Sequence, residues 1–442
     1  MALSGGITAV DPTADSVRRS RRRLGLLVSG LVALVVVSCG GAVDAPVGKL
    51  FFGTLVSDPS HTAAEAAAGI GVAMLELSWS DYEPARGEWN EAYIHAQQER
   101  LHALLASNRR VSLALGVHYT PDWVLDLPDS RYVDDHGQTS DELNVVFNQG
   151  VRDEVATYLS RVANDLGIDN FWSVRLTSGG LAEVLYPEGG SYWAFDANAL
   201  GGPALPPSLR PNPLPDWRPG GTDVPGSAVA NWADWYVSAL ADVVTWQMTT
   251  LQNLGFTGYF EVLTPGTGVG PAAYRKAVDR HLPPGLLGVG AAWDRLYAAL
   301  PRDQNVVAYV SSVADGSGDD DSCAPTDRAV ALDDPTVQDW SATRWISRVA
   351  DEYGFPKRGE NPGYDGSSTL GGHYRDSSAD GMMAAAVRQS RDCGFQGLYW
   401  AHDEQLWDGT VDFAQFESLA RDVNGPTAPA PPDLAPSRAP PN

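Results

Sequence analysis

Short apolar runs alternate with longer amphipathic stretches along most of the chain. Eight apolar runs predict strands, at residues 49–56, 72–80, 110–119, from 171 onward, 258–263, 305–311, a run ending at residue 360, and 397–402. Helical spacing predicts helices at 62–68, 91–107, 148–166, 228–254, 340–353 and 381–393. Strands that alternate with helices predict an α/β protein with a closed parallel sheet, a (β/α)8 TIM barrel with long rim loops.

The two ends of the chain depart from this pattern. Arginines at residues 18–23 precede an apolar run at 24–37, and Ser38 and Cys39 follow, which is the order of a secretory signal. The run is short for a membrane-spanning helix. A Cys after a small residue resembles a bacterial lipoprotein cleavage site, at which Cys39 would be lipidated; an ordinary signal with an incidental Cys is the alternative.

These features divide the chain into four parts. We expect a signal peptide at residues 1–38, a linker at 39–48, the barrel at 49–425 and a Pro-rich disordered tail at 426–442. The predicted location is extracytoplasmic, either lipid-anchored at the cell membrane or secreted. In such an oxidising compartment Cys323 and Cys393 could pair, although their spacing does not show that they meet.

Composition narrows the class of partner. Hydrophobic residues make up 43% of the 442 residues, which is enough for a large core, and the formal net charge is −24. An acidic surface repels phosphate backbones, so we expect no nucleic-acid partner. The membrane contact that we expect is the N-terminal lipid anchor alone.

Two acids carry the candidate chemistry. Glu183 follows the fourth predicted strand and a Gly-Gly loop, and Glu360 ends the seventh strand after Gly359. A barrel delivers the carboxyl ends of all its strands to one rim, so strands four and seven would place the two acids across a cleft. Cleavage of a glycosidic bond needs such a pair, one carboxyl to protonate the leaving oxygen and a second to act as nucleophile or base.

Each acid also has a structural interpretation. Glu183 could form a salt bridge with a barrel arginine such as Arg175, and Glu360 could be a loop acid before the turn that Asn361 begins.

Short motifs resemble known glycoside hydrolase barrels. WSDYEPARGEWN at residues 79–90 is similar to the loop after strand two in the group that holds bacterial β-galactosidases and other retaining enzymes with acids on strands four and seven. GLAEVLYP at 180–187 resembles the acid-bearing Gly-Glu-x-x-Tyr-Pro motif of β-amylases. The resemblance covers about residues 49–420. It implies a retaining O-glycosyl hydrolase of oligo- or polysaccharides, with Glu183 as general acid or acid/base and Glu360 as nucleophile or base.

The chain departs from both patterns just before the acid. The retaining group has Asn there and the β-amylases have Gly, whereas this chain has Ala182. Neither the sugar nor the linkage can therefore be transferred, and the distance between the carboxyls would decide between retention and inversion. The departure also sustains a rival from another class, a non-catalytic carbohydrate-binding lipoprotein on a barrel scaffold.

Other residues at predicted strand ends are candidates for binding sugar. Tryptophans could form stacking walls, and polar side chains could contact the substrate or the nucleophile, as Tyr309 does by analogy with the resembling group. The predicted binding set is Trp79, His118, Tyr119, Arg175, Tyr309, Asn361, Trp400, His402 and Glu404, and Trp123 and Trp193 are further stacking candidates. Glu261 and the cluster at residues 402–404 are rival acids. Glu76 would point into the barrel, where burial calls for a cationic partner.

Metal and cofactor sites are not expected. Residues 315–321 resemble a calcium loop in their alternating Asp and Ser, but positions six and twelve hold Asp320 and Thr326 where Gly and Glu are required, so we interpret them as a solvated acidic loop. The eight His are scattered, which disfavours a metal-dependent hydrolase. The sequence leaves endo or exo action and the oligomeric state open.

Overall fold

A closed eight-stranded parallel barrel forms the centre of the computed structural model, which describes residues 49–314, 321–363 and 370–425. Its strands are β1 (Phe51–Thr54), β2 (Ile70–Glu76), β3 (Arg110–Ala114), β6 (Ser173–Leu176), β7 (Tyr259–Thr264), β8 (Val306–Val310), β9 (Lys357–Glu360) and β10 (Gly397–Trp400). They pair in that order, and β10 closes the barrel on β1 with Phe51 opposite Gly397. The predicted (β/α)8 barrel is confirmed.

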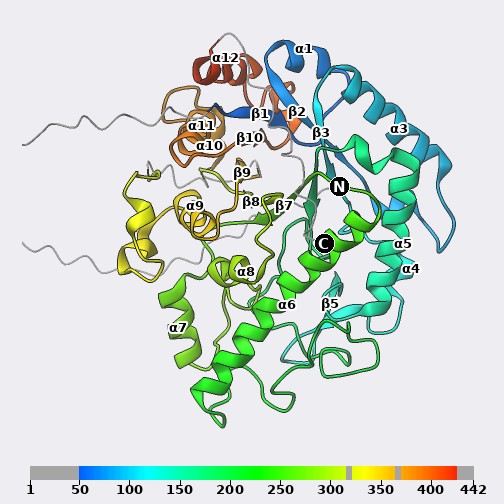
Figure 1. The fold of residues 1–442 in the computed structure, drawn as a ribbon, viewed down its shortest axis with the longest axis vertical. Coiled ribbons are helices and arrows are strands. Elements are labelled where there is room, and N and C mark those ends of the chain that lie inside the picture. Colours follow the sequence, from blue (N-terminus) through cyan, green and yellow to red (C-terminus); the bar gives the residue numbers. More distant parts are fainter. Residues whose placement is uncertain (1–48, 315–320, 364–369, 426–442) are drawn as a thin grey trace, which may run out of the picture.

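Helices surround the barrel on its outer side (Figure 1). The longer ones are α3 (Glu91–Ala106), α5 (Gln149–Leu166), α6 (Gly226–Asn253), α9 (Ala342–Tyr353), α11 (Met382–Asp392) and α12 (Phe413–Asn424). The shorter ones are α1 (Thr62–Ala67), α2 (Trp79–Tyr82), α4 (Asp122–Leu125), α7 (Pro271–Asp279), α8 (Trp293–Ala299) and α10 (Leu370–Arg375). The predicted helices are all present. Six further α-helices of the described ranges were not predicted from the sequence: α2, α4, α7, α8, α10 and α12.

Two insertions lengthen the rim loops on one side. A hairpin of β4 (Arg131–Val133) and β5 (Thr139–Leu143) precedes α5. Between β6 and α6 the chain runs from residue 177 to 225 without a helix or a strand, as its Pro and Gly content predicts.

The inside of the barrel combines apolar and charged layers. At the amino-terminal end the guanidinium of Arg358 lies over the rings of Trp172, Tyr259 and Phe51, at 3.9, 4.2 and 5.5 Å. The same guanidinium pairs through Nη1 with Glu261 Oε1 at 2.8 Å, and both side chains are fully buried. This pair closes the barrel floor beneath the rim.

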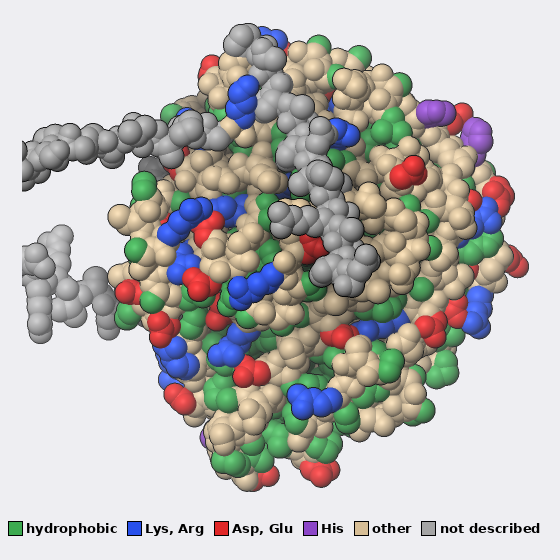
Figure 2. Space-filling view, in the orientation of Figure 1, with side chains coloured by type: hydrophobic (Ala, Val, Ile, Leu, Met, Phe, Trp, Pro, Cys, Tyr) green, Lys and Arg blue, Asp and Glu red, His purple; other side chains and the backbone are tan. Residues whose placement is uncertain are grey.

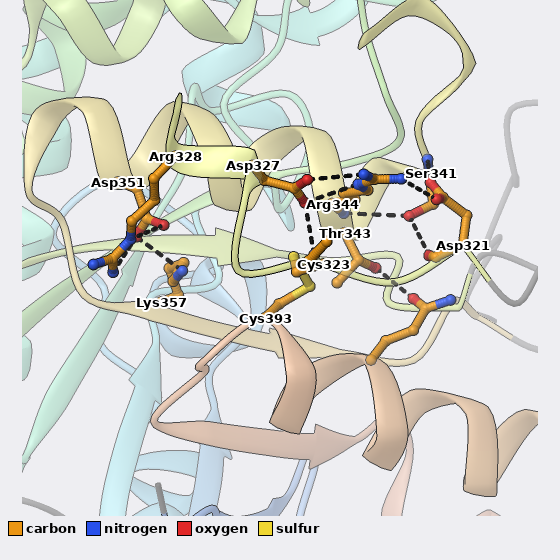
Figure 3. Close-up of a disulfide and its surroundings, with 12 residues drawn as sticks. Asp321, Cys323, Asp327, Arg328, Ser341, Thr343, Arg344, Asp351, Lys357 and Cys393 are labelled. Atoms are coloured by element: carbon orange, nitrogen blue, oxygen red, sulfur yellow. Dashed lines mark hydrogen bonds and ion pairs between the residues drawn. A yellow bond between two sulfur atoms is a disulfide. The ribbon is translucent and has the colours of Figure 1, made fainter. Parts of the chain in front are cut away.

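A disulfide joins the segment after β8 to the end of α11, which answers the question that the cysteine spacing left open. Cys323 and Cys393 are bonded, with their Cα atoms 4.9 Å apart. Beside it, Arg344 of α9 pairs with Asp327 at 2.8 Å and with Asp321 (Figure 3). The described end of the acidic loop is therefore held by an arginine. Residues 315–320 of the proposed calcium pattern lie outside the described residues.

Charged side chains of both signs are interspersed over the face drawn in Figure 2. Within the part of the chain that the structure describes, no helix has both the length and the apolar character needed to cross a membrane. The predicted signal, the lipidation site at Cys39, the linker and the Pro-rich tail lie outside the described residues.

Candidate active site

Glu360 lies inside the barrel at the carboxyl end of β9. Residues 357–360 alternate, so Lys357 and Gly359 face outward while Arg358 and Glu360 face the barrel interior. Glu360 Oε2 accepts a hydrogen bond from the Tyr309 hydroxyl at 2.7 Å and pairs with Arg175 Nη2 at 2.8 Å. The loop-acid interpretation of Glu360 does not hold, because this carboxylate is buried and faces inward.

The groups around Glu360 shift the pKa of its carboxyl in opposite directions. Burial raises the pKa of the Glu360 carboxyl, the Arg175 charge and the Tyr309 hydrogen bond lower it, and Glu183 raises it, with a result of about 7. Glu183 and Glu360 thus act on each other's charge.

The loop that carries Glu183 is held in place by its own hydrogen bonds. The Ser178 hydroxyl donates to the Glu183 carbonyl at 3.1 Å and accepts from the Leu185 amide at 3.0 Å. The Val184 amide then donates to the Leu263 carbonyl on β7 at 3.2 Å. Gly179 has a φ of +100°, and a Cβ there would lie 2.3 Å from Val145 Cγ2. A glycine is therefore required at the turn before the acid.

Glu183 itself makes no ion pair with a residue of the described ranges. Its side chain is partly accessible but deep enough that burial raises the pKa of its carboxyl, an effect that the Arg175 charge and Ser311 oppose and Glu188 reinforces. The arginine that could have locked Glu183 in a salt bridge pairs with Glu360 instead. The ion pair with Arg175 and the Tyr309 hydroxyl stabilise the ionised form of Glu360, whereas Glu183 makes no such ion pair.

Arg175 is the cation at the centre of the site. Burial by itself lowers the pKa of Arg175, but the charges of Glu360, Tyr309, Glu261 and Glu183 raise it above its usual range. Its guanidinium lies 4.9 Å from the centre of the Tyr309 ring. Arg175 and Tyr309, both predicted as binding residues, therefore contact the predicted nucleophile.

Two histidines and a tyrosine lie near this cluster. Burial and the Arg175 charge lower the pKa of His118 to about 4, and its ring lies 4.1 Å from that of the partly exposed Tyr119. Burial also lowers the pKa of His402, which Glu404 opposes from 4.0 Å. The predicted binding residues of strands three and eight thus flank the acids, and neutral imidazoles are expected there at pH 7.

Three predicted binding residues belong to the core instead. Trp79 is fully buried and stacks on Tyr158 at 5.1 Å. Trp400 is fully buried and faces outward, where its ring lies 5.9 Å from that of Phe416. Asn361 is fully buried and uses its amide to join the end of β9 to Ala401. The structure does not support these three as binding residues, because each side chain is fully buried and none has surface left for a sugar.

The remaining stacking candidates and rival acids are also placed. Trp193 is buried in the core, and the half-buried Trp123 donates its indole N–H to the Glu83 carbonyl at 3.1 Å. Glu261 is the partner of Arg358 in the barrel floor, so it is a structural acid.

Two polar groups in the neighbourhood of the Glu183 loop were not predicted from the sequence. Ser311, directly after β8, is buried, and its hydroxyl makes no hydrogen bond of normal geometry within the described residues. Glu142 on β5 packs against Gly180, and burial raises the pKa of its carboxyl to about 7 with help from Glu188 and Asp141. Strand length could have pointed to Ser311, since it ends the run at 305–311. Glu142 had no such signal.

A cavity of about 670 Å³ opens at the other end of the barrel. It is lined at the starts of β7, β8 and β9 by residues that include Tyr259, Asn305 and Lys357. No carboxyl of the rim cluster lines it, so the cavity is distinct from the candidate site. Across the described ranges, no group of three or more His, Cys, Asp or Glu side chains could hold a metal ion.

Comparison with known proteins gives the fold. No protein-family model matches the chain, and no curated protein sequence matches it either. The catalytic domain of β-amylase from Paenibacillus polymyxa is similar in structure, with a TM-score of 0.54 and 12% identity over 85% of this chain and 99% of that one.

A β-galactosidase from the haloarchaeon Halorubrum lacusprofundi is similar with a TM-score of 0.52 and 14% identity, over 85% of this chain and 59% of the other. The chain has the barrel fold of these glycoside hydrolases. At sequence identities this low, the likeness shows a shared fold alone.

Proposed function

We propose that the protein is a glycoside hydrolase in which Glu183 is the general acid and Glu360 the nucleophile. The observation that carries the proposal is the asymmetric setting of two acids at one barrel rim. Glu360 receives a cation and a hydroxyl donor, whereas Glu183 receives no ion pair from a described residue. A glycosidase needs this difference between its two carboxyls. The glycoside hydrolase fold supports the same function.

The proposed chemistry assigns each group a step. Glu183 gives its proton to the leaving oxygen as the glycosidic C–O bond breaks and a Glu360 oxygen bonds to the anomeric carbon. Water then attacks that carbon, its proton returns to Glu183, and the bond to Glu360 breaks. Arg175 and Tyr309 stabilise the charge that Glu360 regains. Retention of anomeric configuration belongs to this proposal, and the Tyr309 contact, which resembles that of the retaining group, supports it.

The test compares Glu183→Gln and Glu360→Gln with the wild type on a panel of polysaccharides and aryl glycosides. Loss of a positioned acid typically lowers the rate by about 10²- to 10⁴-fold, and loss of the nucleophile should cost at least as much. An aryl group that leaves readily needs little protonation, so it should rescue Glu183→Gln and not Glu360→Gln.

Glu99→Gln, on the exposed face of α3, is the control. Full activity in either site variant would contradict the assignment. A wild type that binds sugars without turnover would instead favour the carbohydrate-binding protein, the candidate that Ala182 keeps open.

We further propose that the protein is exported and anchored through Cys39. The basic and apolar residues before Cys39 support export, and so does the Cys323–Cys393 bond, since disulfides persist in oxidising compartments. The Cys39→Ala variant should move from the membrane fraction to the soluble exported fraction when the full chain is expressed in a bacterial host. A wild type found in the soluble fraction would contradict the anchor.

A further inference from the structure

Glu76 is an inward-facing acid that the proposed reaction does not use. It is the last residue of β2, where Val72 and Met74 face the barrel interior, and the period of two places Glu76 on the same side. Arg175 Nη1 contacts Met74 Sδ at 3.2 Å. Glu76 is therefore the next inward position toward the rim, beside the arginine that pairs with Glu360.

Glu76 lacks the partner that its position calls for. Burial raises the pKa of its carboxyl, and the charges of Arg175 and Arg100 oppose this. Yet among the described residues none forms an ion pair or a hydrogen bond with its carboxylate. Arg175 pairs with Glu360, and Arg100 donates to the Ser57 carbonyl at 3.3 Å. Glu76 is half-buried, so its carboxylate has lost part of its hydration, and a cation or hydrogen-bond donors from a ligand would compensate for that loss.

The charged neighbours of Glu76 are of both signs, and Arg175 and Arg100 act on it more strongly than Glu404 does. Glu404, which follows β10, raises the pKa of Glu76 and is largely exposed. His118, whose pKa lies near 4, carries no charge at pH 7. Since Arg175 is already paired with Glu360, the Glu76 carboxylate can still pair with a cation from a ligand.

Two further groups near the acids have capacity for a ligand. Ser311 keeps 8% of its surface exposed, and its hydroxyl, which lies beside the Glu183 carboxyl, makes no hydrogen bond of normal geometry within the described part of the chain. It acts on the Glu183 carboxyl, so it lies at the same rim. Tyr119 keeps 36% of its surface exposed, and the Glu76 charge acts on it. A sugar hydroxyl could form a hydrogen bond with Ser311, and a sugar ring could stack on Tyr119.

We propose that the sugar bound at this rim carries a protonated amine, which pairs with Glu76. The substrate class is then an oligosaccharide of amino sugars with free amino groups, and this inference rests on the proposed glycosidase function. An ammonium group supplies both the charge and the donors that Glu76 lacks. N-acetylation would remove that charge and leave the carboxylate unpaired, so the site would discriminate against acetylated sugars.

The experiment measures kcat/KM at several pH values, so that the sugar amine passes from its protonated to its neutral form. The substrates are oligosaccharides of glucosamine and galactosamine, their N-acetyl forms, and the glucose and galactose counterparts of the same linkage. The wild type should prefer the free amines. Glu76→Gln should lower kcat/KM for the amines about tenfold to a hundredfold, the range for loss of a charge-assisted hydrogen bond, and change the neutral sugars by less than about threefold.

Glu99→Gln is again the control for loss of a carboxylate at a distance. A wild type that prefers neutral sugars, or an equal loss on amines and neutral sugars in Glu76→Gln, would overturn the inference while the hydrolase proposal stood. If nothing is hydrolysed, the hydrolase proposal fails, and calorimetry with the same oligosaccharides decides. Binding of the amines that Glu76→Gln weakens would then support the ammonium site, and binding that ignores the amine would overturn it.

Discussion

The placement of one arginine determines how the two acids differ. Arg175 was a plausible partner for Glu183, which lies in the loop that follows the same strand. In the barrel Arg175 instead reaches Glu360 on β9, because inward side chains of separate strands meet across the interior. The cation stabilises the ionised form of Glu360 and leaves Glu183 without a paired charge. A chain-order argument cannot find such a contact.

Tyr309 should tune the acid limb of the pH profile. Its hydrogen bond favours the ionised form of Glu360 and so lowers the pKa, which burial has raised to about 7. Since Glu360 must be ionised to attack, kcat/KM should fall as the pH drops through about 7. Tyr309→Phe should raise that pKa and move the acid limb upward by about one pH unit.

A matched variant separates this effect from loss of packing. Tyr399 is also a buried tyrosine of the barrel interior, 5.7 Å from the Tyr309 ring, but its hydroxyl donates to Glu261 at 3.2 Å. Tyr399→Phe should leave the acid limb in place. Equal displacement in both variants would contradict a specific role for Tyr309.

At the scale of the element, the phase of each strand decides what reaches the cleft. Tyr399 and Ala401 belong to the interior cluster, so the intervening Trp400 faces outward into the helix layer. Apolar patterning located β10 but did not give its phase, since a strand buried on both sides is apolar at every position. The unsupported stacking prediction for Trp400 follows from this ambiguity.

The disulfide should stabilise the segment after β8. It links Cys323 to Cys393 across 70 residues, and a native disulfide typically contributes about 2–4 kcal/mol, mainly through the unfolded chain. The Cys323→Ser/Cys393→Ser double variant should lower the free energy of unfolding by that amount in denaturant titrations. Reducing agent should destabilise the wild type and leave the double variant unchanged. An insensitive wild type would argue against the bond.

At the scale of the whole molecule, the buried charges of the floor join distant strands. Glu261 of β7 pairs with Arg358 of β9 and accepts hydrogen bonds from Tyr399 of β10 and Ser112 of β3. Four barrel strands therefore depend on one carboxylate. The charge of Glu261 also raises the pKa of Arg175 on β6, so the barrel floor and the candidate site are coupled electrostatically.

Removing one partner of the Glu261–Arg358 pair should destabilise the fold more than removing both partners. Glu261→Gln or Arg358→Met alone leaves a buried charge uncompensated, and each should lower the free energy of unfolding by about 3–5 kcal/mol. The double variant should recover part of that loss, measured in a double-mutant cycle. Additive losses would show that the two charges are not coupled.

The order of the elements follows from local patterns. The apolar runs and helical spacing predicted the eight strands and the main helices, because burial imposes periods of two and 3.6 on the chain wherever it folds. The Gly-flanked acids at strand ends were visible for the same reason, since a parallel barrel sends every strand end to one rim. The hairpin β4–β5 has no comparable apolar signal and was missed.

The partners of each side chain depend on contacts across the barrel. Which acid Arg175 pairs with, the burial of Asn361, the unpaired state of Glu76 and the meeting of Cys323 with Cys393 all depend on strands brought together by barrel closure. Residue types and spacing along the chain carry candidates for these roles. Which candidate takes each role depends on the distances between segments far apart in sequence, and closure of the barrel sets those distances.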